Sequence, residues 1–136
     1  MTTTATFTID LRPAEPLLES GERFTFTKTW SGALEGQSTG VMLTAGEPSA
    51  GDAGYVAAEV FEGTLRGARG TLAFHQLGAM SGGDPGLTYA IAPGSGTGEL
   101  AGTTGTLEIG EIEESGRHHV TLTLETTPIA LDRRIQ

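Results

Sequence analysis

The sequence predicts an all-β domain of about eight short strands, either a closed up-and-down barrel or a sandwich. Glycine supplies 21 of the 136 residues, about twice its usual share of roughly 7%, and threonine is equally frequent. Threonine favours strands, whereas glycine marks turns, bulges and the bends of barrels. The best helix candidate, 13–18, is short and interrupted by Pro16. The chain is long enough for one domain with a real core.

Alternating apolar and polar residues define the expected strands. In the first, Phe7, Ile9 and Leu11 alternate with polar residues, and Phe24, Phe26 and Trp30 do the same in the second. We expect loops at 47–54 and 78–86, where Gly, Pro, Ser and Asp gather. The whole chain, 1–136, is then one domain with a core over about 5–125 and a peripheral tail at 126–136. The expected strands cover 6–11, 24–30, 32–44, 55–65, 70–77, 87–92, 99–109 and 117–125.

Composition excludes several classes of function. The net charge of −9 argues against nucleic acid as a partner, because phosphate contacts need clustered Lys and Arg. No apolar run is long enough to span a membrane, and we expect the start of the sequence not to be a secretory signal, because it has no basic region followed by an apolar stretch. We therefore expect a cytoplasmic protein that does not bind membranes. Cysteine is absent, which removes thiolate nucleophiles and thiolate metal ligands.

The segment 55–61 is apolar on both faces, which is unusual for a strand with one face in water. Tyr55, Ala57 and Phe61 share a face with Glu59, while Val56, Ala58 and Val60 form the other. We expect that second face to lie in a subunit interface or beneath a neighbouring segment of the same chain. The first alternative predicts a homo-oligomer.

Glu59 and His75 are the candidate catalytic residues. If the Glu59 face points into a barrel, the carboxylate lies among apolar groups, where it could act as a general acid or base. His75 lies on the next strand and could meet Glu59 if the turn near 66–70 sets the right register, which would form a proton-transfer pair. The alternatives are a carboxylate at the barrel rim and a histidine at a strand end.

Lys28 and four aromatic residues are candidate ligand contacts. Strict alternation places Lys28 on the inward face with Phe24, Phe26 and Trp30. Beside Glu59 it would then be a buried ion pair or an amine with a lowered pKa, although a bulge or a lysine stem reaching the rim is the interpretation we favour. Aromatic side chains line ligand cavities and also fill ordinary cores. The aromatic candidates are Trp30, Tyr55, Phe61 and Tyr89.

Two other motifs do not indicate a metal or cofactor site. His118 and His119 are adjacent, so in a strand they point to opposite faces and cannot share one metal. The segment 94–98, G-S-G-T-G, lacks the Lys of a phosphate-binding loop and no helix follows it. We expect no metal and no cofactor.

Three motifs resemble an uncharacterised bacterial family of unknown function that has the barrel of allene oxide cyclases and dirigent proteins. They are Y-x-A-x-E-x-F-x-G-x-L-x-G at 55–67, G-x-L-x-x-H at 70–75 and P-G-S-G-T-G-E-L-A-G-x-x-G at 93–105. The resemblance implies an eight-stranded antiparallel up-and-down barrel of the allene oxide cyclase-like kind, with a central cavity, often in an oligomer. The activity of that family is unknown.

Three functions stay open on this basis. The barrel could assist cyclisation or isomerisation of an apolar, natural-product-like substrate, with Glu59 as acid or base and His75 as its partner. It could instead carry or sequester a small hydrophobic ligand without chemistry. Alternatively, the barrel could be filled with side chains and serve only subunit association.

Overall fold

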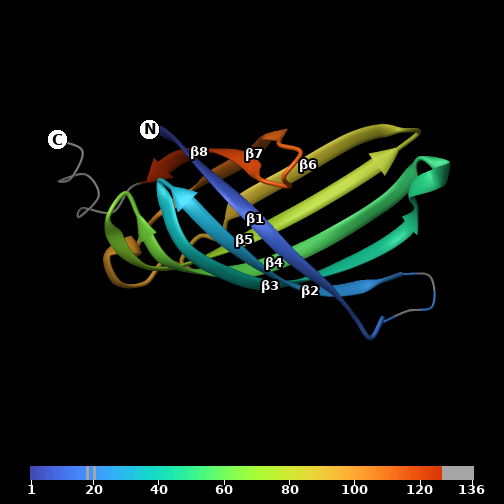
Figure 1. Cartoon of the computed structure of the whole chain (residues 1–136), viewed down its shortest axis with the longest axis horizontal. Helices are drawn as coiled ribbons and strands as arrows, with labels where there is room; N and C mark the ends of the chain where they lie inside the picture. Colours follow the sequence, from blue (N-terminus) through green and yellow to red (C-terminus); the bar gives the residue numbers. More distant parts are fainter. Residues whose placement is uncertain (18, 20, 127–136) are drawn as a thin grey trace.

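Eight antiparallel strands, each paired with its neighbours in sequence, close into a barrel in which β1 pairs with β8 (Figure 1). The computed structural model describes residues 1–17, 19 and 21–126. The predicted barrel is confirmed, and the sandwich is excluded. Except for Thr126, the predicted tail at 126–136 lies outside the described residues. The strands are β1 (Thr2–Ala14), β2 (Arg23–Gly32), β3 (Leu34–Glu47), β4 (Asp52–Leu65), β5 (Ala68–Ser81), β6 (Asp84–Ile91), β7 (Thr104–Ile112) and β8 (His118–Thr126).

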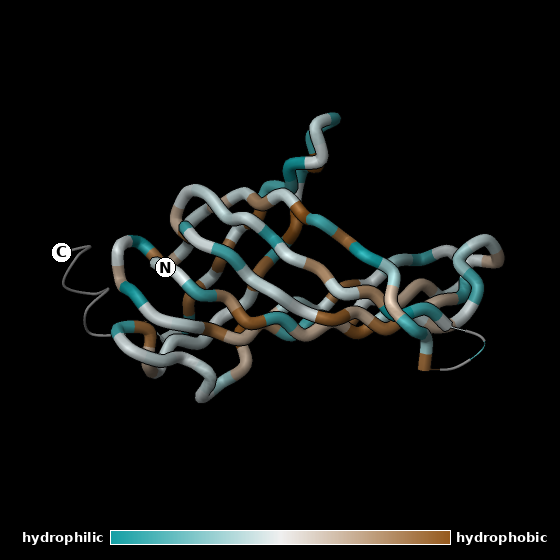
Figure 2. The backbone as a smooth tube through the Cα atoms, turned by 60° about the horizontal axis from the view of Figure 1, so that its bottom comes forward, coloured by the Kyte–Doolittle hydropathy of each residue, from teal (hydrophilic) through white to brown (hydrophobic). Residues whose placement is uncertain are grey.

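Side-chain alternation along each strand decides which residues face the barrel interior. In β2, Phe26, Lys28 and Trp30 are buried inside, whereas Thr25 and Thr29 are exposed outside. The same alternation of hydrophobic and hydrophilic residues is visible along the backbone tube (Figure 2). Threonine-rich outer positions therefore explain the high threonine content of the chain.

The predicted loop at 78–86 is wrong, because the strands run almost to each other. β5 ends at Ser81 and β6 begins at Asp84, joined by Gly82 and Gly83 with φ angles of 58° and 85°. Two successive positive φ angles are what a tight hairpin turn requires, and glycine adopts them without strain. The predicted loop at 47–54 is likewise shorter, a single 3-10 turn at Pro48–Ala50. The start of the predicted strand 99–109 is another 3-10 turn, Gly98–Leu100.

The two ends of the barrel differ because β7 and β8 are short. β8 pairs with β1 only over residues 2–7, so the rest of β1 has a neighbour on one side alone. β6 and β7 are joined at a single residue pair, Ala90 and Thr106. At this end, inward-facing Ile9 and Leu11 are 39% and 42% exposed. The barrel is therefore open at the end formed by the longer strands.

The opposite end is closed by a packed core. The connection between β6 and β7 carries Leu100, which is fully buried there together with Leu34, Leu65 and Leu72. Its Gly-rich part lies along β5, where the Thr97 N–H donates to the Thr71 carbonyl at 3.0 Å and the Ala73 N–H donates to Ser95 Oγ at 3.0 Å. The glycines of this motif thus let a loop dock against a strand. Over the described residues, no helix has the length and apolar character to cross a membrane.

Candidate functional site

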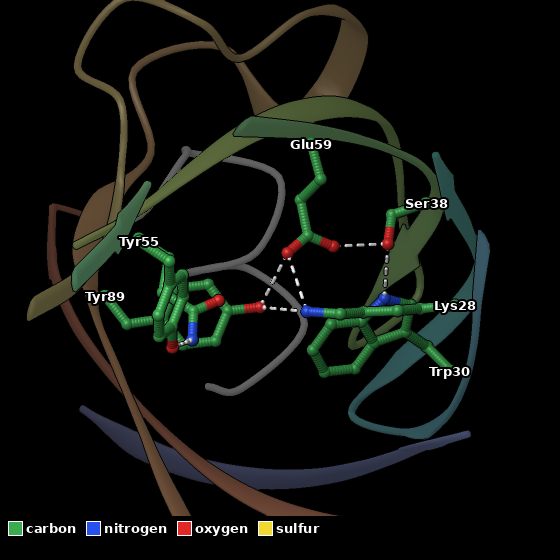
Figure 3. Close-up of polar contacts among 7 residues, drawn as sticks. Lys28, Trp30, Ser38, Tyr55, Glu59 and Tyr89 are labelled. Carbon is green, nitrogen blue, oxygen red and sulfur yellow. Dashed lines mark hydrogen bonds and ion pairs between the residues drawn. The ribbon is translucent and has the colours of Figure 1, made fainter. Parts of the chain in front are cut away.

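A chain of hydrogen bonds links five buried side chains inside the barrel (Figure 3). Glu59 of β4 is at its centre, where Oε1 accepts from Lys28 Nζ at 2.8 Å and from the Tyr89 hydroxyl at 2.9 Å. Ser38 Oγ donates to Glu59 Oε2 at 2.5 Å, and Trp30 Nε1 donates to Ser38 Oγ at 3.0 Å. Lys28 Nζ also donates to the Tyr89 hydroxyl at 3.0 Å. Both oxygens of the carboxylate are therefore engaged by protein donors.

The network is sealed from water. The side chains of Lys28 and Glu59 are only 4% and 1% exposed. Burial lowers the pKa of Lys28, and the charge of Glu59 partly offsets this effect. Burial also raises the pKa of Tyr89 well above its ordinary value of 10.0, and the nearby Glu59 carboxylate raises it further. A buried ion pair is tolerated only where geometry and further hydrogen bonds compensate for lost hydration, as they do here.

Aromatic rings surround the Lys28 ammonium on its remaining sides. Its Nζ lies 4.3 Å from the ring centroid of Phe7 and between 5.1 and 5.7 Å from those of Phe26, Tyr89 and Trp30. At these distances the ring quadrupoles attract a cation. The ammonium is thus held by one carboxylate, one hydroxyl and a group of aromatic faces.

Gly40 makes room for this arrangement. A Cβ atom at Gly40 would lie 2.6 Å from Phe26 Cζ and 2.4 Å from the carbonyl oxygen of Ala58. Gly40 is paired with Glu59 across β3 and β4 and with Phe26 across β2 and β3. The missing side chain therefore lets the Phe26 ring lie over β3 beside the network.

A cavity of about 1300 Å³ opens at the end of the barrel where the strands are longest. We call it the mouth cavity. Its larger apolar and aromatic side chains come from β2 and from β4 to β7, with glycine, alanine and proline between them. They are Phe24, Tyr55, Met80, Leu87, Leu107 and Ile109. The charged residues that line it within 1–17, 19 and 21–126 are all acidic: Glu19, Glu22, Glu47 and Glu108.

Tyr55 is the predicted ligand contact that the structure places in this cavity. It is half-buried, and its hydroxyl accepts from Gln76 Nε2 at 2.6 Å. Its ring lies against Gly78, where a Cβ atom would come within 2.2 Å of Tyr55 Cε1. The mouth cavity thus has a fixed aromatic wall with polar atoms at its inner side.

The other predicted aromatic contacts lie deeper. Trp30 and Tyr89 are each 3% exposed, and Phe61 is fully buried. They are core residues here, and none of them lines the mouth cavity. Trp30 packs edge-on against Phe61 and Phe74 with ring centroids 6.5 and 5.9 Å apart. Aromatic side chains therefore fill the closed part of the barrel.

The predicted pairing of Glu59 with His75 is wrong. In the register of β4 and β5, Glu59 pairs with Phe74, and His75 pairs with Ala58 on the outer face. His75 is exposed and on the opposite side of the sheet from Glu59. The interpretation of Lys28 as a bulge or rim residue is also wrong, because it points inward and forms the buried ion pair that alternation implied.

Ser38, Gln76 and the acidic lining were not identified from the sequence. Ser38 pairs with Lys28 across β2 and β3. Only this register, which the sequence does not define, could have identified Ser38 as a neighbour of Lys28. The adjacent histidines point apart, as predicted. His118 stacks on Phe7 with centroids 4.5 Å apart, and His119 Nε2 lies 2.6 Å from Glu113 Oε2.

Comparisons with known proteins bear on fold and family. Residues 3–124 match the family model described as "Protein of unknown function (DUF3224)". The chain is similar to a protein of unknown function from the DUF3224 family of Shewanella oneidensis, whose crystal structure it matches with 33% identity and a TM-score of 0.83. That match covers 94% of this chain and 98% of the other. No curated protein matches. The likeness to allene oxide cyclases and dirigent proteins stays a prediction.

Proposed function

The chain belongs to the DUF3224 family of proteins of unknown function, and we propose that it binds a small, largely apolar molecule in the mouth cavity. The observation that carries the proposal is an open cavity of about 1300 Å³ with apolar and aromatic walls. Inward-facing Leu87 remains 46% exposed there. Ligand sites are typically concave, mostly apolar and equipped with a few polar groups, and Tyr55 with Gln76 supplies such groups.

The acidic lining supports a neutral or cationic ligand. Among the residues that the structure describes, four glutamates and no Lys, Arg or His line the cavity, and the chain as a whole carries a net charge of −9. Clefts lined by one sign of charge repel ions of that sign and concentrate the opposite one. An anionic ligand of the same shape is therefore expected to bind more weakly.

Binding without chemistry is the form of the proposal that the geometry favours. Glu59 is sealed behind the mouth cavity, with three donors on its two oxygens, and His75 is on the outer face. Cyclisation or isomerisation with Glu59 as acid or base would need a substrate to reach that carboxylate. If the protein only binds its ligand, the buried hydrogen-bond network stabilises the barrel below the cavity. We then expect Glu59→Gln to leave the affinity for the ligand unchanged.

The test is a fluorescence titration with the neutral probe N-phenylnaphthylamine and two matched variants. Leu87→Asn changes the inner wall of the cavity, whereas Leu77→Asn changes an outer position of the adjacent strand, with exposures of 46% and 55%. Removing a leucine contact worth about 1.5 kcal/mol weakens binding about tenfold, so Leu87→Asn should show this loss and Leu77→Asn should not. Equal effects of the two variants, or no binding by the wild type, would overturn the proposal.

The charge preference is tested with a matched pair of probes. Anilinonaphthalenesulfonate has the same aromatic frame as the neutral probe and adds one sulfonate. Four carboxylates at roughly 8 Å, partly screened by salt, should weaken its binding about tenfold relative to the neutral probe. We expect Glu22→Gln/Glu108→Gln to narrow that gap, and high salt to do the same. A sulfonated probe that binds more tightly at low salt would contradict the assignment.

A further inference from the structure

Outward-facing side chains on three neighbouring strands form an apolar surface, which we call the aliphatic face. Val41, Val56, Val60 and Leu77 on it are 45%, 47%, 53% and 55% exposed. Strand register brings them together, because Val56 pairs with Leu77 and with Leu43 across β4. The face consists of Val41, Leu43, Val56, Ala58, Val60, Ala73 and Leu77.

Aliphatic residues at outward positions are not needed for strand formation, because other strands of the barrel carry threonine there. Outer positions of β2 are Thr25, Thr27 and Thr29, and those of β8 include Thr121 and Thr123. Valine and threonine are nearly the same shape, and both favour strands. Strands β3 to β5 carry aliphatic residues where the other strands carry threonine, so water is not the expected neighbour of this face.

Within the part of the chain that the structure describes, no other segment covers the aliphatic face, since Val41, Val56, Val60 and Leu77 keep about half of their surface exposed. Val56, Ala58 and Val60 are therefore not buried by any segment among residues 1–17, 19 and 21–126. Contiguous exposed apolar surface of this kind marks interaction sites in soluble domains.

We propose that the aliphatic face is the interface of a homodimer, in which a second copy of this chain presents the same face. The argument for this partner is charge. The chain carries 17 acidic residues, yet the aliphatic face contains no Asp, Glu, Lys or Arg. The charged outer residues beside it are one basic residue, Arg23, which pairs with Leu43, and one acidic residue, Glu62, which follows Val60 on the outer side of β4. A second copy therefore meets no excess of like charge at this face, although each copy carries a net charge of −9, whereas a strongly basic or acidic partner would find no complementary charge.

The size of the face sets the expected strength. The face spans three strands about 4.8 Å apart, with neighbouring outward residues of a strand about 6.6 Å apart, and has two residues on β3, three on β4 and two on β5. Its apolar area is therefore smaller than the roughly 800 Å² per partner of a standard interface. The face thus forms the apolar centre, and flanking polar residues such as Thr39 and Thr88 form the rim. We expect a dimer that dissociates in the micromolar range. His75, which lies between Ala58 and Ala90 in the register, becomes an interface residue.

Sedimentation velocity across micromolar concentrations tests the dimer. The decisive variant is Val41→Thr/Val56→Thr/Val60→Thr, which keeps side-chain shape and imitates the threonine-lined strands. We expect the wild type to shift from monomer to dimer with concentration, and the triple variant to need at least about tenfold more protein. Thr121→Val/Thr123→Val, the reverse change on β8, whose neighbours in the barrel are β1 and β7 rather than β3, β4 or β5, is the matched control and should dimerise as the wild type does.

Circular dichroism and urea unfolding of the triple variant keep the test independent of folding, since threonine at exposed strand positions should leave the barrel intact. A wild type that stays monomeric throughout, or a folded triple variant that dimerises equally well, would overturn the proposal. Binding of the neutral probe to the mouth cavity should be the same in all these variants, because the aliphatic face is on the other side of the sheet.

Discussion

Replacing Lys28 by methionine should destabilise the barrel severely, because it leaves the Glu59 carboxylate buried without its cation. The two side chains are 4% and 1% exposed, with Nζ and Oε1 2.8 Å apart, so solvent screens the pair little. Methionine fills nearly the space of the lysine stem, which keeps any cavity small. The variant leaves the buried charge of Glu59 without its counterion, and breaking such a buried pair lowers the free energy of unfolding by about 3–5 kcal/mol. This loss is a large share of the free energy of unfolding of a typical domain, which is roughly 5–15 kcal/mol.

A double-mutant cycle separates this electrostatic loss from lost packing. Glu59→Gln alone should cost less, because a buried lysine whose pKa is already lowered can release its proton. Lys28→Met/Glu59→Gln removes both charges, and the amide can still accept from Ser38 or Tyr89. The double variant should therefore recover much of the loss, with a coupling energy of about 2–3 kcal/mol.

The assay is equilibrium unfolding in urea, followed by far-ultraviolet circular dichroism and Trp30 fluorescence. Arg12→Met is the matched control, since Arg12 and Asp10 form an ion pair at 3.0 Å whose side chains are 75% and 60% exposed. Exposed pairs contribute little, so this change should barely move the midpoint. If Lys28→Met does not fold, the folded double variant still carries the test. A Lys28→Met variant as stable as the wild type, or strictly additive effects in the cycle, would refute the reasoning.

The remaining predictions concern proton uptake and packing around the same network. Because burial and Glu59 raise the pKa of Tyr89 well above 10.0, the native state keeps a proton that the unfolded chain loses, and this group makes stability fall as pH rises above about 10. Tyr89→Phe should lessen that fall in urea unfolding, and an ultraviolet titration of the native protein that shows both tyrosines ionising near 10 would contradict the assignment. Gly40→Ala should cost about 1–3 kcal/mol, since its Cβ would lie 2.4 Å from the Ala58 carbonyl oxygen, whereas the control Gly86→Ala meets nothing closer than 3.9 Å and should change the unfolding midpoint little.

Alternation predicted the strands, because it is a local property of each strand, but it left a barrel and a sandwich open, and the family resemblance implied the barrel. Strict alternation also placed Lys28 on the inward face, although we favoured a bulge or a stem reaching the rim, and the inward direction of Glu59 was one of two alternatives. The pairing of residues from different strands depends on turn length, which the sequence defines less well. β4 and β5 are joined so that Leu65 pairs with Ala68, and this places even-numbered residues of β5 inside and His75 outside. A turn one residue longer or shorter would have reversed that result.

The mouth cavity could not be predicted for a related reason. It exists because β8 pairs with only the first part of β1 and because β6 and β7 share a single pair. Both facts concern the residues at which hydrogen bonding between neighbouring strands ends. The alternation of residues along each strand does not mark these positions. Trp30, Phe61 and Tyr89 were expected in the cavity for their chemistry, yet their depth in the barrel makes them core. Only Tyr55, near the open end of β4, was predicted to contact a ligand and lines the cavity.

The most direct test of the central claim is a crystal structure of the protein with the neutral probe bound. We expect the probe in the mouth cavity, against Tyr55 and Leu87, with the hydrogen bonds from Lys28, Ser38 and Tyr89 to Glu59 unchanged below it. A probe found instead on the aliphatic face would contradict the account. So would a probe inside the barrel that displaces Lys28 from Glu59, because it would show that the sealed network is itself the binding site.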